Sequence, residues 1–142
     1  FSLGLWGKPE YSFGAGTFLN KNTVFFPEFK HFTGSRTIVL NEDPNLLAFQ
    51  LLDYYTLSTT DSYFEGHVEH HFNGFILNKI PLLRRLGFQA VSGINYLKTK
   101  EADHLEFFVG IENILGDGRV DFVGGYDREN QFVSGFRVNL GL

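Results

Sequence analysis

The 142-residue chain contains no cysteine and no methionine. The absence of cysteine excludes disulfide bonds, cysteine nucleophiles and thiolate metal sites in this chain. The net charge is only −4, from 12 basic and 16 acidic residues that are interspersed along the chain. This balance gives no support to a nucleic-acid-binding surface, so we expect no nucleic-acid partner. No apolar run approaches the ~18 residues that a membrane helix requires, so any membrane crossing must use β-strands.

Aromatic residues and glycine are abundant instead. The chain has 17 Phe, 6 Tyr and 16 Gly, and this composition predicts many short strands joined by tight turns. An alternating pattern is already under way at Phe1, Leu3 and Leu5, and residues 1–142 show no features of a signal peptide, so we expect any export signal to lie upstream of Phe1. We therefore expect residues 1–142 to form one unit, the C-terminal portion of a larger domain.

Alternating apolar and polar residues predict about eight strands in a meander of successive hairpins. We expect these strands at residues 1–8, 11–19, 47–58, 63–72, 88–97, 105–112, 119–126 and 132–142. Lys8-Pro9-Glu10 and residues 59–62 are predicted turns, and residues 20–45 a long ordered loop with a short strand at 37–40. In the clearest strand, one face carries Phe64, Gly66, Val68, His70 and Phe72, and the other carries Tyr63, Glu65, His67, Glu69 and His71.

The fold class that we predict is an all-β, antiparallel, up-and-down transmembrane β-barrel. The expected strands match the ~9–11 residues that cross a bilayer at a tilt, whereas strands of soluble sheets average ~5–6 residues. Aromatic residues gather near the expected strand ends, as in the interfacial girdles of membrane barrels. They are Tyr54, Tyr55, Tyr63, Phe72, Phe88, Tyr96, Tyr126 and Phe132. A soluble barrel is the alternative, because alternation alone does not distinguish an inward from an outward apolar face.

The last expected strand resembles the C-terminal signal of bacterial outer-membrane barrels, which barrel-assembly machinery reads. Its apolar face carries Phe132, Phe136, Val138, Leu140 and Leu142. Unpaired backbone groups cost several kcal/mol each in lipid, so a membrane barrel must close on itself. We expect these strands to be the C-terminal part of a larger barrel, with a self-contained eight-stranded barrel as the alternative.

Several motifs resemble the C-terminal region of the DUF5686 family. They are GAGTFLN at 14–20, FPEFKHF at 26–32, LDYY at 52–55, EGHVEHHFNGFILNKIPLLR at 65–84, EFFVGIE at 106–112 and RVD at 119–121. The resemblance implies a Bacteroidota outer-membrane barrel whose N-terminal carboxypeptidase-regulatory-like β-sandwich and early strands lie outside this chain. The expected partners are outer-membrane lipids, barrel-assembly machinery, that N-terminal domain and other subunits of an outer-membrane complex.

Three polar residues of the 63–72 strand are candidates for chemistry. His67, Glu69 and His71 lie on one strand face, and two histidines with a carboxylate can form a zinc ligand set. The same face of a membrane barrel lines the lumen, where polar residues are the rule, so we favour a solvated lumen wall. Glu106, Glu112, Asp121 and Arg137 are likewise expected to be lumen-facing or rim charges. Since there is also no G-x-S-x-G motif, we expect no catalytic residue, no metal and no cofactor, and hence no enzyme.

The segment after this strand predicts a membrane-interface element. It would form a short helix or turn with leucines in the bilayer and cations at the headgroups, and Pro81 suits its first turn. The residues concerned are Lys79, Pro81, Leu82, Leu83, Arg84 and Arg85. The alternative is a plain loop whose leucines cover the barrel rim. If Leu142 ends on the periplasmic side, the expected strand count places both long connections, 20–45 and 73–87, on that side.

Together these features predict an integral, porin-like β-barrel of the Gram-negative outer membrane, with a structural, transport or envelope-assembly role. Two competing hypotheses remain. One is an outer-membrane enzyme with a metal at His67, Glu69 and His71. The other is a soluble ligand-binding β-barrel.

Overall fold

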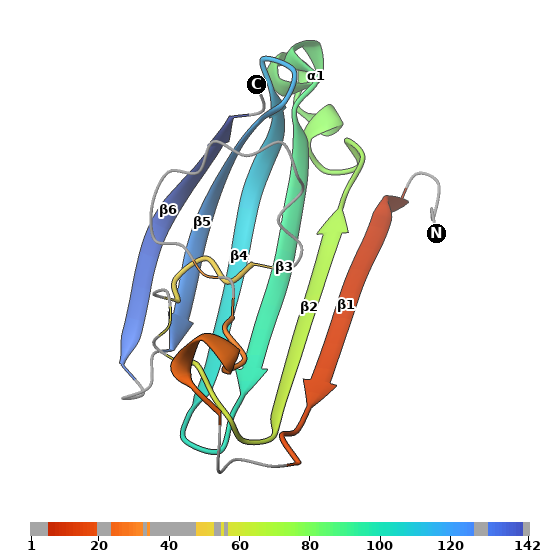
Figure 1. Ribbon diagram of the computed structural model, residues 1–142. Helices are drawn as coiled ribbons and strands as arrows, with labels where there is room; N and C mark the ends of the chain where they lie inside the picture. The colour runs from red at the N-terminus through yellow and green to blue at the C-terminus, as the bar shows by residue number, and fades with distance from the viewer. Residues whose placement is uncertain are drawn as a thin grey trace.

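Six strands form one antiparallel sheet in the chain order β1-β2-β3-β4-β5-β6 (Figure 1). The computed structural model describes residues 6–19, 24–32, 34, 48–52, 55, 57–126 and 131–140. The strands are β1 Lys8–Gly16, β2 Tyr63–His71, β3 Gln89–Lys98, β4 Asp103–Ile114, β5 Gly118–Tyr126 and β6 Phe132–Leu140, and the helices are η2 Phe26–Glu28, η3 Leu77–Lys79 and α1 Pro81–Leu86. The sheet is open, with β1 and β6 at its edges. None of the helices in the described ranges is long and apolar enough to cross a membrane.

The two faces of the sheet differ in chemistry, because alternate side chains of a strand point to opposite sides. The outer face presents exposed apolar side chains: Tyr11, Phe13, Phe64, Val68, Ile94, Leu105, Phe107, Val109, Val120, Phe122, Phe132, Phe136 and Leu140. The covered face carries buried polar side chains: His67, Glu69, Asn95, His104, Glu106, Asp121 and Arg137. This arrangement is the reverse of an ordinary soluble sheet, which turns its apolar face to the core.

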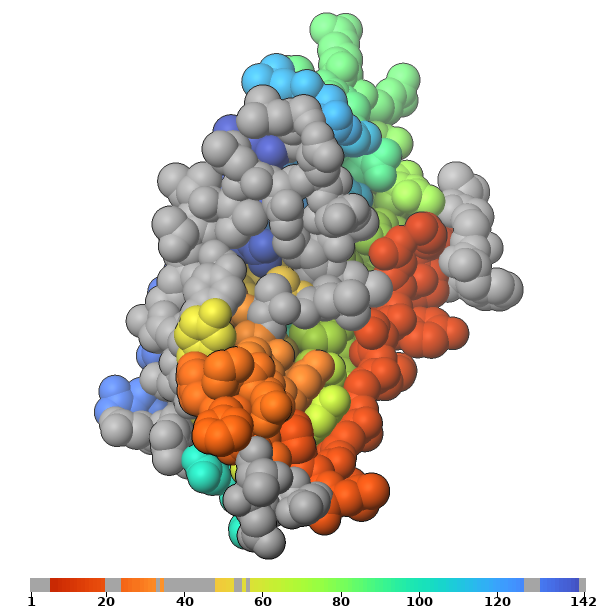
Figure 2. Space-filling view, in the orientation of Figure 1, coloured from red at the N-terminus to blue at the C-terminus, as the bar shows by residue number. Residues whose placement is uncertain are grey.

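The connection between β1 and β2 packs on the covered face. We call its residues 24–32, 48–52 and 57–60 the inner segment, and in Figure 2 their orange and yellow atoms lie in front of the sheet. Phe32, Phe49, Leu52 and Leu57 of this segment pack around Leu97 of β3, and Leu51 packs with Val91, Phe108 and Val123. The apolar core therefore lies between the inner segment and the sheet, in the same layer as the buried charges.

Five of the predicted strands are confirmed. Those expected at 63–72, 88–97, 105–112, 119–126 and 132–142 correspond to β2 through β6, with small differences at the ends. Residues 141–142 lie outside the described ranges. The two faces predicted for residues 63–72 are also confirmed, since His67 and Glu69 are buried while Phe64 and Val68 are exposed.

The strand expected at 11–19 is confirmed over residues 11–16, which belong to β1. The predicted turn at Lys8-Pro9-Glu10 is wrong, because these residues begin β1. This strand pairs with β2 along its whole length, from Lys8 opposite His71 to Gly16 opposite Tyr63. An edge strand accommodates proline, which lacks an N–H group, because one side of its backbone has no partner strand. Of the strand predicted at 1–8, residues 1–5 lie outside the described ranges, as do residues 37–40.

The strand predicted at residues 47–58 is also wrong. In its described part, Phe49 makes only an isolated bridge with Gly34. The N–H groups of Gln50 and Leu51 bind a side-chain carboxylate instead of a neighbouring strand. Of residues 59–62, predicted as a hairpin turn, the first two end the inner segment and the last two lead into β2. The prediction was a barrel of about eight strands, and the described residues form an open sheet of six.

The absence of that strand changes where the long connections lie. Gly16 faces Tyr63 at the end of the sheet where Lys98 faces Asp103. The connection between β2 and β3 lies at the opposite end, together with the end of β6 (Figure 1). The prediction that both long connections share one end is wrong, because it counted one strand too many between them.

Candidate functional site

The Glu106 carboxylate of β4 has four hydrogen-bond partners on the covered face, and its side chain is fully buried. Oε1 accepts hydrogen bonds from the Gln50 N–H at 2.5 Å and from Asn95 Nδ2 at 2.7 Å. Oε2 accepts from the Leu51 N–H at 2.9 Å and lies 3.2 Å from His104 Nε2. A buried carboxylate is costly unless donors surround it, and charge-assisted bonds are strong. These bonds therefore fasten the inner segment to β4.

Asn95 and two histidines complete this Glu106 cluster. Asn95 Oδ1 lies 3.0 Å from His67 Nδ1. The Phe49 ring contacts both imidazoles, with centroids 4.8 Å from His67 and 5.7 Å from His104. His67 faces Asn95 across β2 and β3, and Asn95 faces Glu106 across β3 and β4. Directly opposed residues on one face lie within contact range, so the register of three strands builds the cluster.

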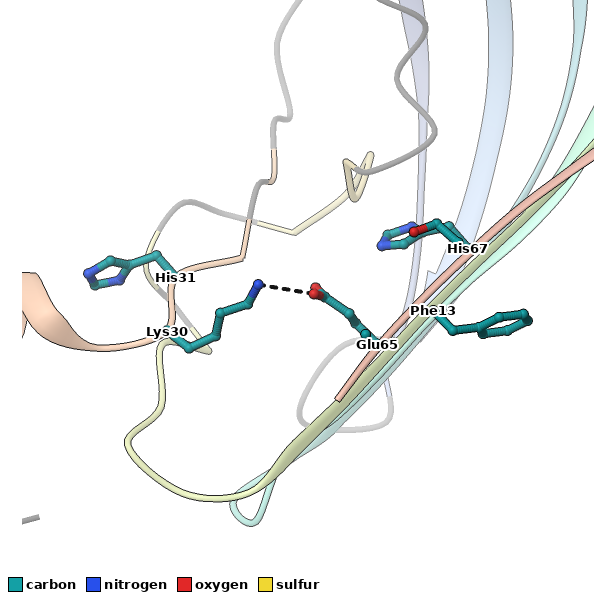
Figure 3. Close-up of a pocket in the computed structure, with 7 residues that line it drawn as sticks. Phe13, Lys30, His31, Glu65 and His67 are labelled. Atoms are coloured by element: carbon teal, nitrogen blue, oxygen red, sulfur yellow. Dashed lines mark hydrogen bonds and ion pairs between the residues drawn. The ribbon is translucent and has the colours of Figure 1, made fainter. Parts of the chain in front are cut away.

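A second set of contacts holds the earlier part of the inner segment. Lys30 Nζ lies 3.0 Å from Glu65 Oε1 of β2, and the Lys30 backbone exchanges hydrogen bonds of 3.0 and 3.1 Å with Thr59. Figure 3 shows Lys30 reaching toward Glu65, while the Phe13 ring points away to the other side of the sheet. Beside the ion pair is a cavity of about 200 Å³, lined by Ser12, Phe13, Gly14, Lys30, His31, Glu65 and His67. It has room for several water molecules, each of which fills ~30 Å³ in the liquid.

Arg119 of β5 is the centre of a second charged cluster. Its Nη1 and Nη2 donate to the Glu69 carboxylate of β2 at 2.6 and 3.2 Å, and its Nε donates to both oxygens of Asp121 at 2.9 Å. The guanidinium carbon lies 5.3 Å from the centroid of the Phe108 ring. A planar guanidinium with several fixed N–H groups suits this arrangement, in which one cation neutralises two carboxylates on different strands.

His71 and Arg137 extend the Arg119 cluster. His71 Nε2 lies 3.0 Å from Glu69, and His71 Nδ1 lies 2.9 Å from Glu112. Arg137 of β6 faces Asp121 in register and is buried. Two of its N–H groups, at Nε and Nη1, have no hydrogen-bond partner in the described structure. The covered face thus carries fixed charges of both signs from β2 across to β6.

The predicted candidates for chemistry, His67, Glu69 and His71, all lie on the covered face of β2, but the structure gives them different partners. His67 contacts Asn95 in the Glu106 cluster, whereas Glu69 and His71 belong to the Arg119 cluster. Among the residues that the structure describes, no group of three or more His, Asp or Glu side chains is placed to hold a metal ion. The geometry favours a structural interpretation, in which each of these side chains binds a polar or oppositely charged partner on the covered face.

The other predicted site residues lie at one end of the sheet and on β6. Lys79 ends η3, and the other residues of the predicted membrane-interface element form most of α1: Pro81, Leu82, Leu83, Arg84 and Arg85. Pro81 takes the first helical turn, as predicted. Of the C-terminal strand signal, Phe136 and Leu140 are exposed on the outer face and Val138 is half-buried, while Leu142 lies outside the described residues.

Sequence reasoning did not predict what Glu106 and Arg119 do. Alternation placed Glu106, Asp121 and Arg137 among the lumen-facing or rim charges, and the structure puts all three on the covered face. Their partners could not be predicted, because these depend on the register between strands and on the path of the inner segment. The sequence predicted the face on which these charges lie, but it did not predict their partners.

One family model matches the chain, over residues 1–111, and it describes the C-terminal domain of a family of unknown function, DUF5686. The match begins before β1 and ends within β4, so β5 and β6 lie beyond it. No curated protein and no solved structure shows significant similarity to the chain. The match covers 111 of the 142 residues, and it confirms the resemblance carried by the sequence motifs. The chain therefore belongs to the DUF5686 family, through a match to the model of its C-terminal domain.

Proposed function

We propose that the chain forms part of the wall of an integral outer-membrane β-barrel, with its outer face toward lipid and its covered face toward the lumen. The observation that carries this proposal is the reversed polarity of the sheet. Phe13 and Phe136 are 62% and 75% exposed on the outer face, whereas Glu106 and Arg137 are 0% and 4% exposed on the covered face. A soluble monomer rarely exposes so extended an apolar surface, but the wall of a membrane barrel requires one.

Strand length supports the same proposal. β1, β2, β5 and β6 have 9 residues each, β3 has 10 and β4 has 12. At ~3.3 Å per residue, nine residues extend over ~30 Å, or ~23 Å along the membrane normal at a tilt of ~40°. Outer-membrane barrels carry an apolar band ~25 Å tall. The strands are therefore long enough to form such a band.

A barrel in lipid also needs closed edges, since unpaired backbone groups are costly there. We propose that further strands pair with the free edges of β1 and β6. With the end of β6 on the periplasmic side, the β1–β2 connection becomes an extracellular loop that folds into the lumen as the inner segment. Long extracellular loops are usual in these barrels. Periplasmic turns are usually short, and the predicted strand count placed two long connections on that side. The observed strand count leaves the β2–β3 connection there and moves the β1–β2 connection to the extracellular side.

The inner segment supports a barrel whose lumen is partly filled. Glu106 and Lys30 fasten it to the lumen side of the wall. Such a barrel suits a structural, transport or envelope-assembly role, alone or as a subunit of a larger complex. An origin in Bacteroidota, an N-terminal β-sandwich and contact with barrel-assembly machinery are parts of the same proposal, and the family resemblance supports them.

The substitution Phe122→Arg tests the proposal. Phe122 lies at the middle of β5 on the outer face, opposite Val109 and Phe136. An arginine at the bilayer midplane costs ~2–4 kcal/mol, so we expect the full-length variant to fold poorly into liposomes and to be depleted from the outer membrane. Leu115→Arg, in the fully exposed turn between β4 and β5, is the matched control and should behave as wild type. Equal folding of both variants in buffer without detergent would contradict the membrane barrel and favour a soluble one.

A further inference from the structure

The connection between β2 and β3 forms a distinct surface at the end of the sheet where β6 ends (Figure 1). It spans residues 72–88 and contains η3 and α1, and neither helix has a buried residue. α1 begins at Pro81 and ends at Leu86, and the following Gly87, with a φ of 72°, forms a left-handed cap. The helix has clear start and stop signals, yet its apolar side chains are not buried against the sheet.

Aliphatic side chains are exposed along this connection. Leu82 is 69% exposed and Leu86 is 53% exposed, and residues four apart lie on the same side of a helix. Ile76 and Ile80, just before α1, are 44% and 49% exposed. Four exposed aliphatic side chains within one short connection indicate a surface that is covered by an apolar partner or by lipid.

Cations lie beside these aliphatic groups. Arg84 and Arg85 are exposed, and within the described structure neither forms an ion pair. Lys79 Nζ lies 4.7 Å from the centroid of the Phe75 ring. Residues 72–88 include no Asp or Glu. Guanidinium groups bind phosphate oxygens through paired N–H donors, so the arginines fit an anionic phosphate partner.

Aromatic rings lie at the same level of the sheet. Trp6 is 65% exposed and stacks on Phe75, with ring centroids 4.9 Å apart. Tryptophan is enriched at the membrane–water interface, where an apolar body and a polar edge are both accommodated. The Trp6–Phe75 pair lies outside α1, and it also indicates a membrane–water interface at this end of the sheet.

The opposite end of the sheet has a different charge arrangement. Lys98 Nζ lies 3.4 Å from the Asp103 carboxylate, and Lys100 Nζ lies 3.9 Å from the Asp61 carboxylate. Its lysines thus lie beside acidic side chains, whereas neither Arg84 nor Arg85 forms an ion pair in the described structure. This difference makes the α1 end the better match for an anionic surface.

We propose that the β2–β3 connection docks on the phosphate layer of an anionic phospholipid bilayer. Leu82 and Leu86 insert below the headgroups, and Arg84 and Arg85 bind the headgroup phosphates. In a bilayer, the anionic phosphates and the apolar acyl chains lie within ~5–10 Å of each other in depth, so both kinds of side chain can be accommodated at once. The inference rests on the proposed membrane barrel and adds the lipid class and the end of the sheet that binds it.

The test measures binding and insertion of the full-length protein with vesicles of phosphatidylcholine, alone or mixed with phosphatidylglycerol. Wild type should prefer the anionic vesicles. Arg84→Gln combined with Arg85→Gln should weaken binding to anionic vesicles by about 30-fold, which corresponds to ~1 kcal/mol for each cation at such a surface. High salt should reduce the difference, because it screens exposed charges. Insertion into pure phosphatidylcholine should stay unchanged.

Lys98→Gln combined with Lys100→Gln is the matched control, since it removes the same charge from the opposite end. This control should keep the anionic preference. An unchanged preference in the arginine variant would overturn the docking, and so would an equal loss in both variants, which would mean that only net charge matters. Competition by inorganic phosphate at matched ionic strength would reveal a free-anion site and also overturn it. Insertion into neither type of vesicle would overturn both the barrel and the docking. Insertion into both types without an anionic preference would overturn the docking alone, so the two failures can be told apart.

Discussion

Replacing Glu106 with glutamine should release the inner segment from the sheet. The carboxylate accepts the main-chain N–H groups of Gln50 and Leu51 on different oxygens. Glutamine has nearly the same size, but one of its two terminal groups is an NH₂ that cannot accept a hydrogen bond. Whichever way the amide is turned, one of these two main-chain donors loses its acceptor.

The cost follows from the number and type of these bonds. A hydrogen bond to a charged group contributes ~1.5–3 kcal/mol, and a buried donor left unpaired costs ~1–3 kcal/mol. The bonds that remain also weaken, because they are no longer charge-assisted. We expect the free energy that holds the inner segment on the sheet to fall by ~2–4 kcal/mol, which raises its open population by roughly 30-fold to 1,000-fold.

Hydrogen exchange of the full-length folded protein measures this opening. The amides of Gln50 and Leu51 should exchange faster by that factor, while the centre of β4 keeps its protection. Glu112→Gln is the matched control, because Glu112 lies on the same face of β4 but its carboxylate binds His71 instead of the inner segment. Unchanged exchange at Gln50 and Leu51 in Glu106→Gln, or the same change in both variants, would refute the role given to Glu106.

Two further predictions concern the charged pairs. Arg119→Met should destabilise the folded protein by ~3–5 kcal/mol, because Glu69 and Asp121 lose their shared cation while buried. The denaturation midpoint should fall, and Arg119→Lys should recover only part of the loss because lysine lacks the guanidinium fork; full recovery would show that charge alone matters. Lys30→Met and Glu65→Gln in a double-mutant cycle should couple by less than ~1 kcal/mol, because their ion pair is partly exposed, at 32% and 19%. A coupling well above that value would contradict the accessible position of this pair beside the cavity.

Alternation was sufficient to predict strands whose two faces differ in polarity. In β2, the covered positions Glu65, His67, Glu69 and His71 are all polar, and this pattern predicted both the strand and its faces. The turn predicted at the start of β1 was wrong, because proline is common in turns but an edge strand also accommodates it, as at Pro9. Local pattern therefore identified most of the strands, and failed where strand position mattered more than residue type.

The path of the inner segment and the pairing of charges could not be predicted from local pattern. Residues 48–52 have the apolar content of a strand, but the N–H groups of Gln50 and Leu51 bind Glu106. That error added a strand and moved one long connection to the wrong end of the sheet. Arg119 and Glu69 are 50 positions apart in the chain, and their contact depends on the register of the three strand pairings between β2 and β5.

Lipid accessibility along β4 tests most directly whether the outer face meets lipid. The chain contains no cysteine, so single cysteines can carry spin labels at successive positions of the strand. In the membrane, labels at Leu105, Phe107 and Val109 should be accessible to oxygen dissolved in lipid, whereas labels at His104 and Phe108 should be shielded from it, which gives a period of two. The assignment of this face to lipid would be contradicted if a water-soluble relaxation agent reached the outer-face labels as readily as oxygen does.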